Sequence, residues 1–250
     1  GPASHLKKQG TPTMGGIIII IAMIISVVGA YIYMNMTGKT ETAQKLIPLL
    51  LLTIGFGAIG FIDDYKKLVL KNTEGLKPSY KMLGLLVISV AYVLYLTQGL
   101  DIGTETYIPI LKIYINLQNY IYVPAAILIL ATTNAVNLTD GIDGLSSSVS
   151  AIIITILTII GITIGMEEVS IFGSIVIGAT LGFLMFNLHP AKVFMGDTGS
   201  LLLGGVISGL ALYLKMPLLL LIIALIPVLE TLSVIIQVAY FKKTGKRIFK

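Results

Sequence analysis

Cysteine and tryptophan are both absent from this 250-residue chain, and charged residues make up only 12% of it. Without cysteine the protein forms no disulfide, has no reactive thiol and builds no thiolate metal site. Soluble domains carry about a quarter charged residues. The low charge content, together with 56% hydrophobic residues and a mean hydropathy of +0.95, therefore indicates an integral membrane protein.

Apolar blocks long enough to cross a bilayer recur along the chain. About 20 residues at about 1.5 Å each cross the hydrocarbon core, and unbroken runs such as 17–25 fit helices rather than barrel strands. We expect an all-α polytopic bundle forming a single transmembrane domain over residues 1–250, cut from a longer chain at both ends. The eight expected spans are 17–35, 46–62, 82–98, 120–136, 147–165, 170–187, 199–215 and 218–240.

Two further features belong to this expected bundle. Segment 99–119 is too short and too polar to span, and its near-alternating YIPILKIYINL predicts a short external hairpin near 101–119. Glycines inside three spans are expected to allow close helix packing in lipid. These glycines are Gly55, Gly57 and Gly60; Gly173, Gly178 and Gly182; and Gly204, Gly205 and Gly209.

Basic residues divide unequally between the two sides of the expected bundle. Lys7, Lys8, Lys66, Lys67, Lys71, Lys77, Lys81, Lys192, Lys242, Lys243, Lys246, Arg247 and Lys250 fall on one side. Lys39, Lys45, Lys112 and Lys215 fall on the other. The excess predicts that the first side is cytoplasmic. Four polar motifs lie there: HLKKQGTPTMGG (5–16), FIDDYKK (61–67), NAVNLTDGIDGL (134–145) and NLHPAKVFMGDTGS (187–200).

Adjacent carboxylates, Asp63 and Asp64, end an apolar span in the second motif. A solvated helix end would account for them, but acids at a helix C-terminus oppose the macrodipole. Neighbouring carboxylates also repel each other unless a cation or proton lies between them. A divalent metal or a proton-accepting role explains the pair better.

The third motif carries Asn134, Asn137, Asp140 and Asp143 at i,i+3 spacing, which places them along one side of the final helical turns. One of the aspartates would serve as an N-cap for the helix expected to start near Ser147. Capping leaves the other aspartate and Asn137 unexplained, so the cluster is a candidate binding site.

The fourth motif contains Asn187, His189, Lys192, Gly196, Asp197, Thr198, Gly199 and Ser200. Asp197 would simply cap the next span, but the glycines around it leave backbone N–H groups open to a phosphate. Lys7 and Lys8, in the first motif, provide either an anion site or a basic anchor at the membrane edge.

Acidic residues without cysteine favour a hard cation, magnesium or manganese, and the lysines favour phosphate. The motifs predict metal-assisted phosphoryl transfer at a membrane surface. No GxxxxGK[ST] motif occurs, which argues against ATP hydrolysis.

With GTPTMGG, FIDDYKK, NLTDGIDGL and VFMGDTGSLLLGG in this order, the chain resembles the polyprenyl-phosphate N-acetylhexosamine-1-phosphate transferase superfamily, and within it the phospho-N-acetylmuramoyl-pentapeptide transferases. The resemblance implies a ten-helix bacterial plasma-membrane enzyme, a homodimer in many members, with a cytoplasmic active site. Such an enzyme moves phospho-MurNAc-pentapeptide from UDP-MurNAc-pentapeptide to undecaprenyl phosphate with Mg²⁺, giving lipid I and UMP.

The resemblance also implies residue roles. Asp63, Asp64 and Asp197 match catalytic positions, with Asp63 the base toward the lipid phosphate and Asp197 the magnesium ligand. Asn137, Asp140, Asp143, Asn187, Gly196 and Ser200 match the substrate pocket, and Lys67, Lys81, Lys7 and Lys8 match groups that meet phosphate or uridine.

Two alternatives stay open on the sequence. A sibling enzyme would transfer GlcNAc-1-phosphate to the same lipid, and the donor used in vitro distinguishes it. A transporter would use the same acids to bind cargo, although carriers place their sites near the middle of the membrane, and it would release no UMP.

Overall fold

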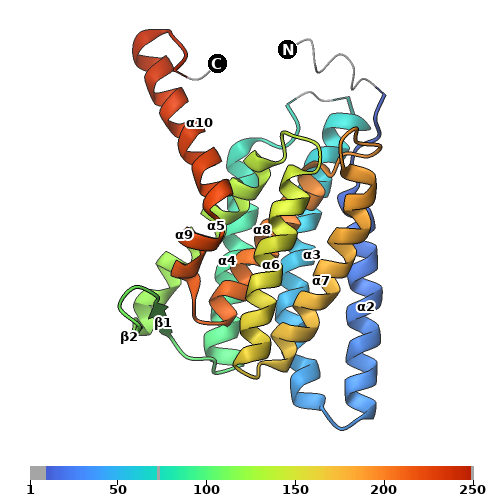
Figure 1. The fold of residues 1–250 in the computed structure, drawn as a ribbon, viewed down its shortest axis with the longest axis vertical. Coiled ribbons are helices and arrows are strands. Elements are labelled where there is room, and N and C mark those ends of the chain that lie inside the picture. The colour runs from blue at the N-terminus through green and yellow to red at the C-terminus, as the bar shows by residue number, and fades with distance from the viewer. Residues whose placement is uncertain (1–9, 72–73, 249–250) are drawn as a thin grey trace.

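The protein is a bundle of long helices with one small hairpin, seen here in a computed structural model that describes residues 10–71 and 74–248 (Figure 1). The long helices are α2 (Gly16–Met36), α3 (Thr40–Leu68), α4 (Pro78–Leu94), α5 (Tyr122–Thr139), α6 (Leu145–Thr163), α7 (Glu167–Asn187), α8 (Gly196–Tyr213) and α10 (Leu225–Thr244). Shorter pieces are a π-helical turn (Tyr95–Gly99), two 3-10 turns (Gln118–Ile121, Pro217–Leu219) and α9 (Leu220–Ile223). The expected all-α bundle is confirmed.

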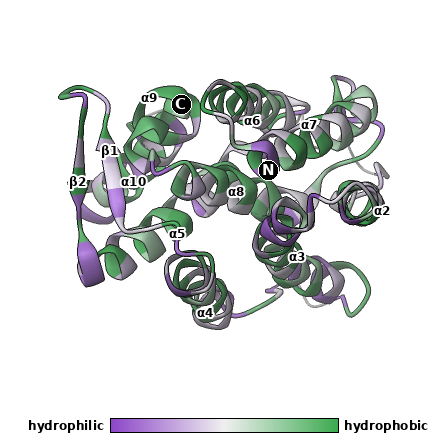
Figure 2. Ribbon diagram, turned by 90° about the horizontal axis from the view of Figure 1, so that it is seen from below, coloured by the Kyte–Doolittle hydropathy of each residue, from purple (hydrophilic) through white to green (hydrophobic). Residues whose placement is uncertain are grey.

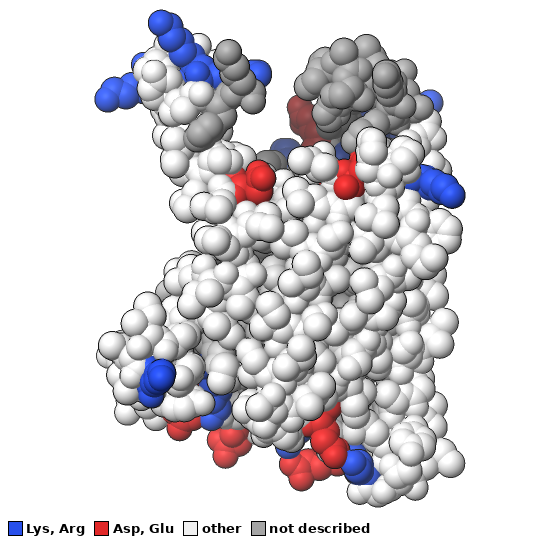
Figure 3. Space-filling model, viewed as in Figure 1, with Lys and Arg blue, Asp and Glu red and all other residues white. Residues whose placement is uncertain are grey.

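Seven helices among the described residues are long and apolar enough to cross a membrane: all of the long helices except α8. Figure 3 shows why the chain suits a bilayer, because charged side chains gather toward the two ends of the visible face and leave a wide uncharged band between them. The protein is therefore a multi-pass membrane protein.

Helix α8 coincides with the remaining expected span and lies at the centre of the bundle. It packs most extensively against α3 and α5, and Figure 2 shows the other helices arranged around it. Its 18 residues are almost all buried. A helix enclosed by protein needs less hydropathy than one facing lipid, so α8 tolerates five glycines and Asp197.

The three glycines expected in this span lie where helices meet closely. A Cβ added to Gly204 would lie 2.5 Å from Thr133 Cα, so no larger residue fits between α8 and α5 there. Similar contacts occur at Gly205 and Gly209. In α7, by contrast, Gly178 and Gly182 have no neighbour within 4 Å, so the packing interpretation is wrong for those two.

The last expected span, 218–240, is not one helix. The structure breaks it at Ala224, between the short α9 and α10. Pro227 follows three residues later. In a continuous helix it would have no N–H to bond the carbonyl of Ile223, and its ring would clash with that carbonyl. The interruption lets α10 lean away from the rest of the bundle (Figure 1).

The predicted hairpin is confirmed. Strands β1 (Glu105–Ile108) and β2 (Ile113–Asn116) pair antiparallel, with Tyr107 opposite Tyr114. The Lys215–Glu105 ion pair and a hydrogen bond from Tyr107 N to the Lys215 carbonyl join the hairpin to the end of α8.

Successive helices run in opposite directions, which brings distant segments together. We call the site end the end of the bundle where α3, α5 and α7 finish and α4, α6 and α8 begin (Figure 1). The described parts of all four polar motifs lie at this end. The hairpin and the α2–α3 loop lie toward the other end.

Candidate active site

The first acid of the pair, Asp63, lies in the last turns of α3 and is only 2% exposed. Its Oδ2 lies 2.6 Å from Lys67 Nζ, one turn further along the helix, and 3.8 Å from Lys81 Nζ on α4. Its Oδ1 accepts a hydrogen bond of 2.6 Å from the Leu76 N–H. Lys67 and Lys81 therefore provide positive charge beside Asp63, which offsets the repulsion expected between the two adjacent carboxylates.

The neighbouring acid, Asp64, has different partners because adjacent helical side chains point about 100° apart. Its carboxylate accepts hydrogen bonds from Thr198 N (2.8 Å), Thr198 Oγ1 (2.6 Å) and Asp197 N (3.1 Å). These donors form the first turn of α8, where N–H groups have no partner within the helix. Asp64 thus holds the start of α8 against the end of α3.

This contact corrects one expectation. The amides around Asp197 were expected to be open to a phosphate, but the Asp197 and Thr198 amides donate to Asp64. Gly199 is also covered, since a Cβ on Gly16 of α2 would lie 2.2 Å from the Gly199 nitrogen. In this structure the start of α8 binds a carboxylate of its own chain.

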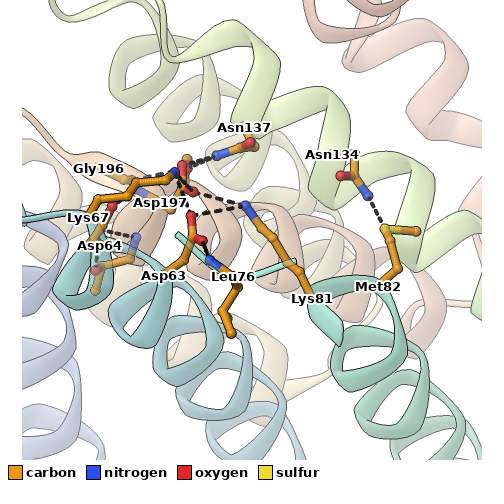
Figure 4. Close-up of polar contacts among 12 residues, drawn as sticks. Asp63, Asp64, Lys67, Leu76, Lys81, Met82, Asn134, Asn137, Gly196 and Asp197 are labelled. Atoms are coloured by element: carbon orange, nitrogen blue, oxygen red, sulfur yellow. Dashed lines mark hydrogen bonds and ion pairs between the residues drawn. The ribbon is translucent and has the colours of Figure 1, made fainter. Parts of the chain in front are cut away.

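Asp197 lies opposite Asp63, and the same two lysines join them (Figure 4). Its Oδ2 is 2.9 Å from Lys81 Nζ and 3.1 Å from Lys67 Nζ. Its Oδ1 accepts a hydrogen bond of 2.9 Å from Asn137, which also donates to Ser200 at 2.7 Å. The second, third and fourth motifs therefore meet at one carboxylate that is 20% exposed.

Gly196, which precedes Asp197, is required by its backbone. Its φ is +75°, a conformation that side-chain-bearing residues rarely adopt. A Cβ there would also lie 2.7 Å from Asp64 Oδ2. Glycine at this position lets the chain turn into α8 directly beside the acid pair.

A cavity of about 510 Å³ opens beside Asp197. It is lined by Thr13, Asp64, Asn137, Asp140, Gly141, Ile142, Asp143, Asn187, Phe194, Gly196 and Asp197. Burial, reinforced by the negative charges of Asp197 and Asp64, raises the pKa of Asp140 from its ordinary value near 3.8 to about 8. Four of the lining residues are aspartates and none is a lysine or arginine, so the cavity is acidic.

Two of the predicted pocket residues also fix the backbone around the cavity. Asn187 accepts a hydrogen bond from Ser147 Oγ (2.7 Å) and donates to the Val193 carbonyl (2.9 Å). Asp143 Oδ2 lies 3.1 Å from His189 Nδ1 and accepts a hydrogen bond of 3.2 Å from Ala191 N. Both residues line the cavity while holding the 188–195 loop in place.

The polar residues fall into two groups around Asp197. Asp64, Asn137 and Asp140 line the cavity, whereas Asp63, Lys67 and Lys81 are not among its lining residues. Lys81 comes from α4, so this second group lies between α3 and α4. Asp197 and its neighbour Asn137 form the boundary between the two groups.

The capping alternatives are wrong. The N-cap of α6 is Gly144, at φ +73°, rather than Asp140 or Asp143. The N-cap position of α8 is Met195, and Asp197 lies inside the first turn. Lys7 and Lys8 lie outside the described residues, so their predicted contacts stay predictions.

Sequence reasoning did not single out Thr13, which lines the cavity, or Ser147, which holds the lining residue Asn187. Thr13 lines the cavity because the 10–16 segment pairs with the 194–195 backbone, for example through Phe194 N to the Pro12 carbonyl (2.8 Å). Its place inside GTPTMGG was the available signal. Ser147 gave no signal, because a serine in an expected helix resembles any other until its partner is known.

The fold and site define a membrane-embedded glycosyl transferase, since the model of "Glycosyl transferase family 4" matches residues 46–215. A phospho-N-acetylmuramoyl-pentapeptide-transferase signature matches residues 8–20. Proteins of that name from Clostridium botulinum strain Alaska E43, Clostridium perfringens strain SM101 and Halalkalibacterium halodurans are 49%, 51% and 47% identical. Each alignment covers all of this chain and 74–75% of the relative. The chain belongs to the phospho-N-acetylmuramoyl-pentapeptide transferase family and is an enzyme of the glycosyl-1-phosphate transferase class. The transporter alternative is therefore excluded.

Proposed function

We propose that the protein transfers phospho-MurNAc-pentapeptide from UDP-MurNAc-pentapeptide to undecaprenyl phosphate. An oxygen of the acceptor phosphate forms a bond to the sugar-linked phosphorus, and the bond from that phosphorus to UMP breaks. The products are lipid I and UMP. We further propose that the site end faces the cytoplasm of a bacterial plasma membrane, since the thirteen basic residues assigned to that side outnumber the four on the other.

One observation supports this chemistry above the others. Asp63 and Asp197 lie on either side of Lys67 and Lys81, at the edge of a cavity of about 510 Å³ at one end of a membrane bundle. Paired lysines suit the phosphates of two anionic substrates. The cavity at the helix ends suits a water-soluble donor, and the surrounding lipid provides the acceptor.

The residues present fit a magnesium ion. Asp197, Asp64 and Asp140 face one cavity with carboxylate oxygens, the kind of ligand that magnesium prefers. Within residues 10–71 and 74–248 no three acidic, histidine or cysteine side chains enclose a metal. Magnesium needs no such cage, because it keeps several waters and binds one or two carboxylates together with substrate phosphates. Asp197 would hold the ion, whose positive charge would neutralise part of the negative charge of the donor diphosphate.

The protein's own side chains would do the rest. Asp63 would accept a proton from the acceptor phosphate. Lys67 and Lys81, now paired with carboxylates, would donate to phosphate oxygens when substrates arrive. Asn137 would keep Asp197 oriented, and Asp64 would keep α8 in register with α3.

The test is a transfer assay with purified protein, undecaprenyl phosphate and Mg²⁺. We expect UMP release and a lipid-linked product from UDP-MurNAc-pentapeptide, and no product from UDP-GlcNAc. Transfer from UDP-GlcNAc alone would instead establish the GlcNAc-1-phosphate alternative. Homodimer formation stays a prediction, and the mass of the purified particle tests it.

A further inference from the structure

Asn134 is a polar residue on the site's helix that the proposed function does not use. It lies on α5 one turn before Asn137 and five residues before the helix ends at Thr139. The helical rise places it about 7.5 Å inside that end, and it is half-buried. Asn134 belongs to the candidate membrane span Gln118–Thr139, and a polar side chain on such a helix is costly and is usually kept for a function.

The contacts of Asn134 leave one of its hydrogens weakly bound. Its Nδ2 donates to the Leu130 carbonyl of its own helix at 2.7 Å. The other contact of this nitrogen is Met82 Sδ on α4, at 3.6 Å. A thioether is a weak acceptor, so a phosphate oxygen would readily replace it.

The position of Asn134 relative to the cavity matters more. Asn134 is not among the residues that line the cavity, and Figure 4 shows it on the Met82 side of Lys81, away from Asp197. Phosphoryl transfer places the attacking and leaving oxygens roughly in line on opposite sides of the phosphorus. If the donor occupies the cavity, the acceptor phosphate must approach from the α4 side of Asp197.

We propose that Asn134 binds the acceptor phosphate, donating a hydrogen bond to it beside Lys81 as the lipid enters between α4 and α5. The inference rests on the proposed function for the class of acceptor, a polyprenyl phosphate. Asn134 is the deepest member of the row that continues through Asn137 to Asp140. It therefore meets a membrane-borne phosphate before the cavity residues do.

A structural role gives a different expectation. Asparagine also joins helices in membranes, and the Met82 contact would be that join between α5 and α4. Met82→Leu removes the sulfur but keeps the packing. It therefore abolishes the hydrogen bond between α5 and α4 while leaving the Asn134 amide unchanged. The two variants, Asn134→Leu and Met82→Leu, thus separate binding from joining.

The experiment measures direct binding of a short-chain polyprenyl phosphate to the purified protein in detergent, without donor. We expect Asn134→Leu to weaken binding about tenfold, the typical loss of one hydrogen bond to a charged group. Met82→Leu should bind as the wild type does. Binding of UMP, a probe of the cavity side, should stay within twofold in both variants. Asn134→Asp, which adds a negative charge at the same size, should weaken lipid-phosphate binding further.

Three results would overturn the inference: unchanged lipid-phosphate binding in Asn134→Leu, an equal loss in Met82→Leu, or an equal loss of UMP binding. A wild type that binds no polyprenyl phosphate would do the same. The choice of sugar donor is tested separately in the transfer assay. Failure of the proposed donor therefore remains distinguishable from failure of this inference.

Discussion

The adjacent acids at the end of α3 should respond differently to the same substitution. Asp63 contacts two lysines and the Leu76 amide, whereas Asp64 contacts the first turn of α8. Changing either one to asparagine removes a charge while keeping the size. We expect Asp63→Asn to lose activity with little loss of stability, and Asp64→Asn to lose stability as well.

The cost at Asp64 follows from its three hydrogen bonds. An asparagine oxygen in place of Oδ2 keeps both Thr198 bonds but turns its NH₂ toward the Asp197 N–H, which now lies 3.1 Å from Oδ1. One bond to a charged acceptor is lost and a buried donor is left unpaired. Together these should lower the free energy of unfolding by about 2 to 4 kcal/mol.

The cost at Asp63 is smaller. An asparagine oxygen still accepts the Leu76 N–H, and Lys67 keeps its contact with Asp197. Because the Lys67 side chain is 40% exposed, its ion pair with Asp63 contributes about 1 kcal/mol or less. Loss of a catalytic base, in contrast, lowers turnover by two orders of magnitude or more.

The assay combines thermal unfolding in detergent with UMP release. At about 2 to 4 °C per kcal/mol for a chain of this size, Asp64→Asn should melt about 5 °C or more below wild type, and Asp63→Asn within about 3 °C. Equal melting temperatures for the two variants would contradict these different roles. Activity of Asp63→Asn within tenfold of wild type would contradict the role of Asp63 as a base.

Three further predictions concern the cavity and the orientation. In metal-free protein the pKa of Asp140, about 8, lies above its unfolded value, so the folded state binds the extra proton and stability falls as pH rises toward 8. Asp140→Asn should therefore reduce the change in melting temperature between pH 5 and 9. The same change in the variant as in wild type would refute this. Gly196→Ala should lower the free energy of unfolding by about 1 to 2 kcal/mol from its positive φ alone, and it should also lower turnover. Melting and UMP release check this against Gly178→Ala, a control at an exposed α7 position that does not line the cavity. A cysteine at Gly141, where nothing lies within 4 Å, should not react with an impermeant thiol reagent in intact cells, whereas a cysteine at the exposed Thr37 should be labelled. The reverse pattern would show that the site end faces outward.

The fold was largely predictable from the sequence. Long apolar runs between polar loops located most helices closely, as with 17–35 against Gly16–Met36. The apolar run did not locate the break at Ala224, because it continues through that residue. The proline three residues later gave the only sequence signal, and its effect depends on whether the neighbouring helices support a straight span.

The sequence predicted which residues belong to the site but not which contacts they make with one another. Counting spans places Asp63 and Asp197 at the same end, and both are there. That Lys67 and Lys81 join them is a tertiary contact that no local pattern encodes. The role of Asp64 was hidden for the same reason: its donors belong to a helix that begins more than a hundred residues later.

We infer that Asp197, facing Asp63 across two lysines, would hold the magnesium ion on which transfer depends. The most direct test is UMP release against magnesium concentration for wild type and Asp197→Asn. The variant keeps the size and one oxygen but loses the charge, and we predict that turnover falls at least a hundredfold and that the magnesium needed rises steeply. Normal turnover at the same magnesium concentration as wild type would contradict the claim and would move the metal site elsewhere, with Asp63 and Asp64 the next candidates.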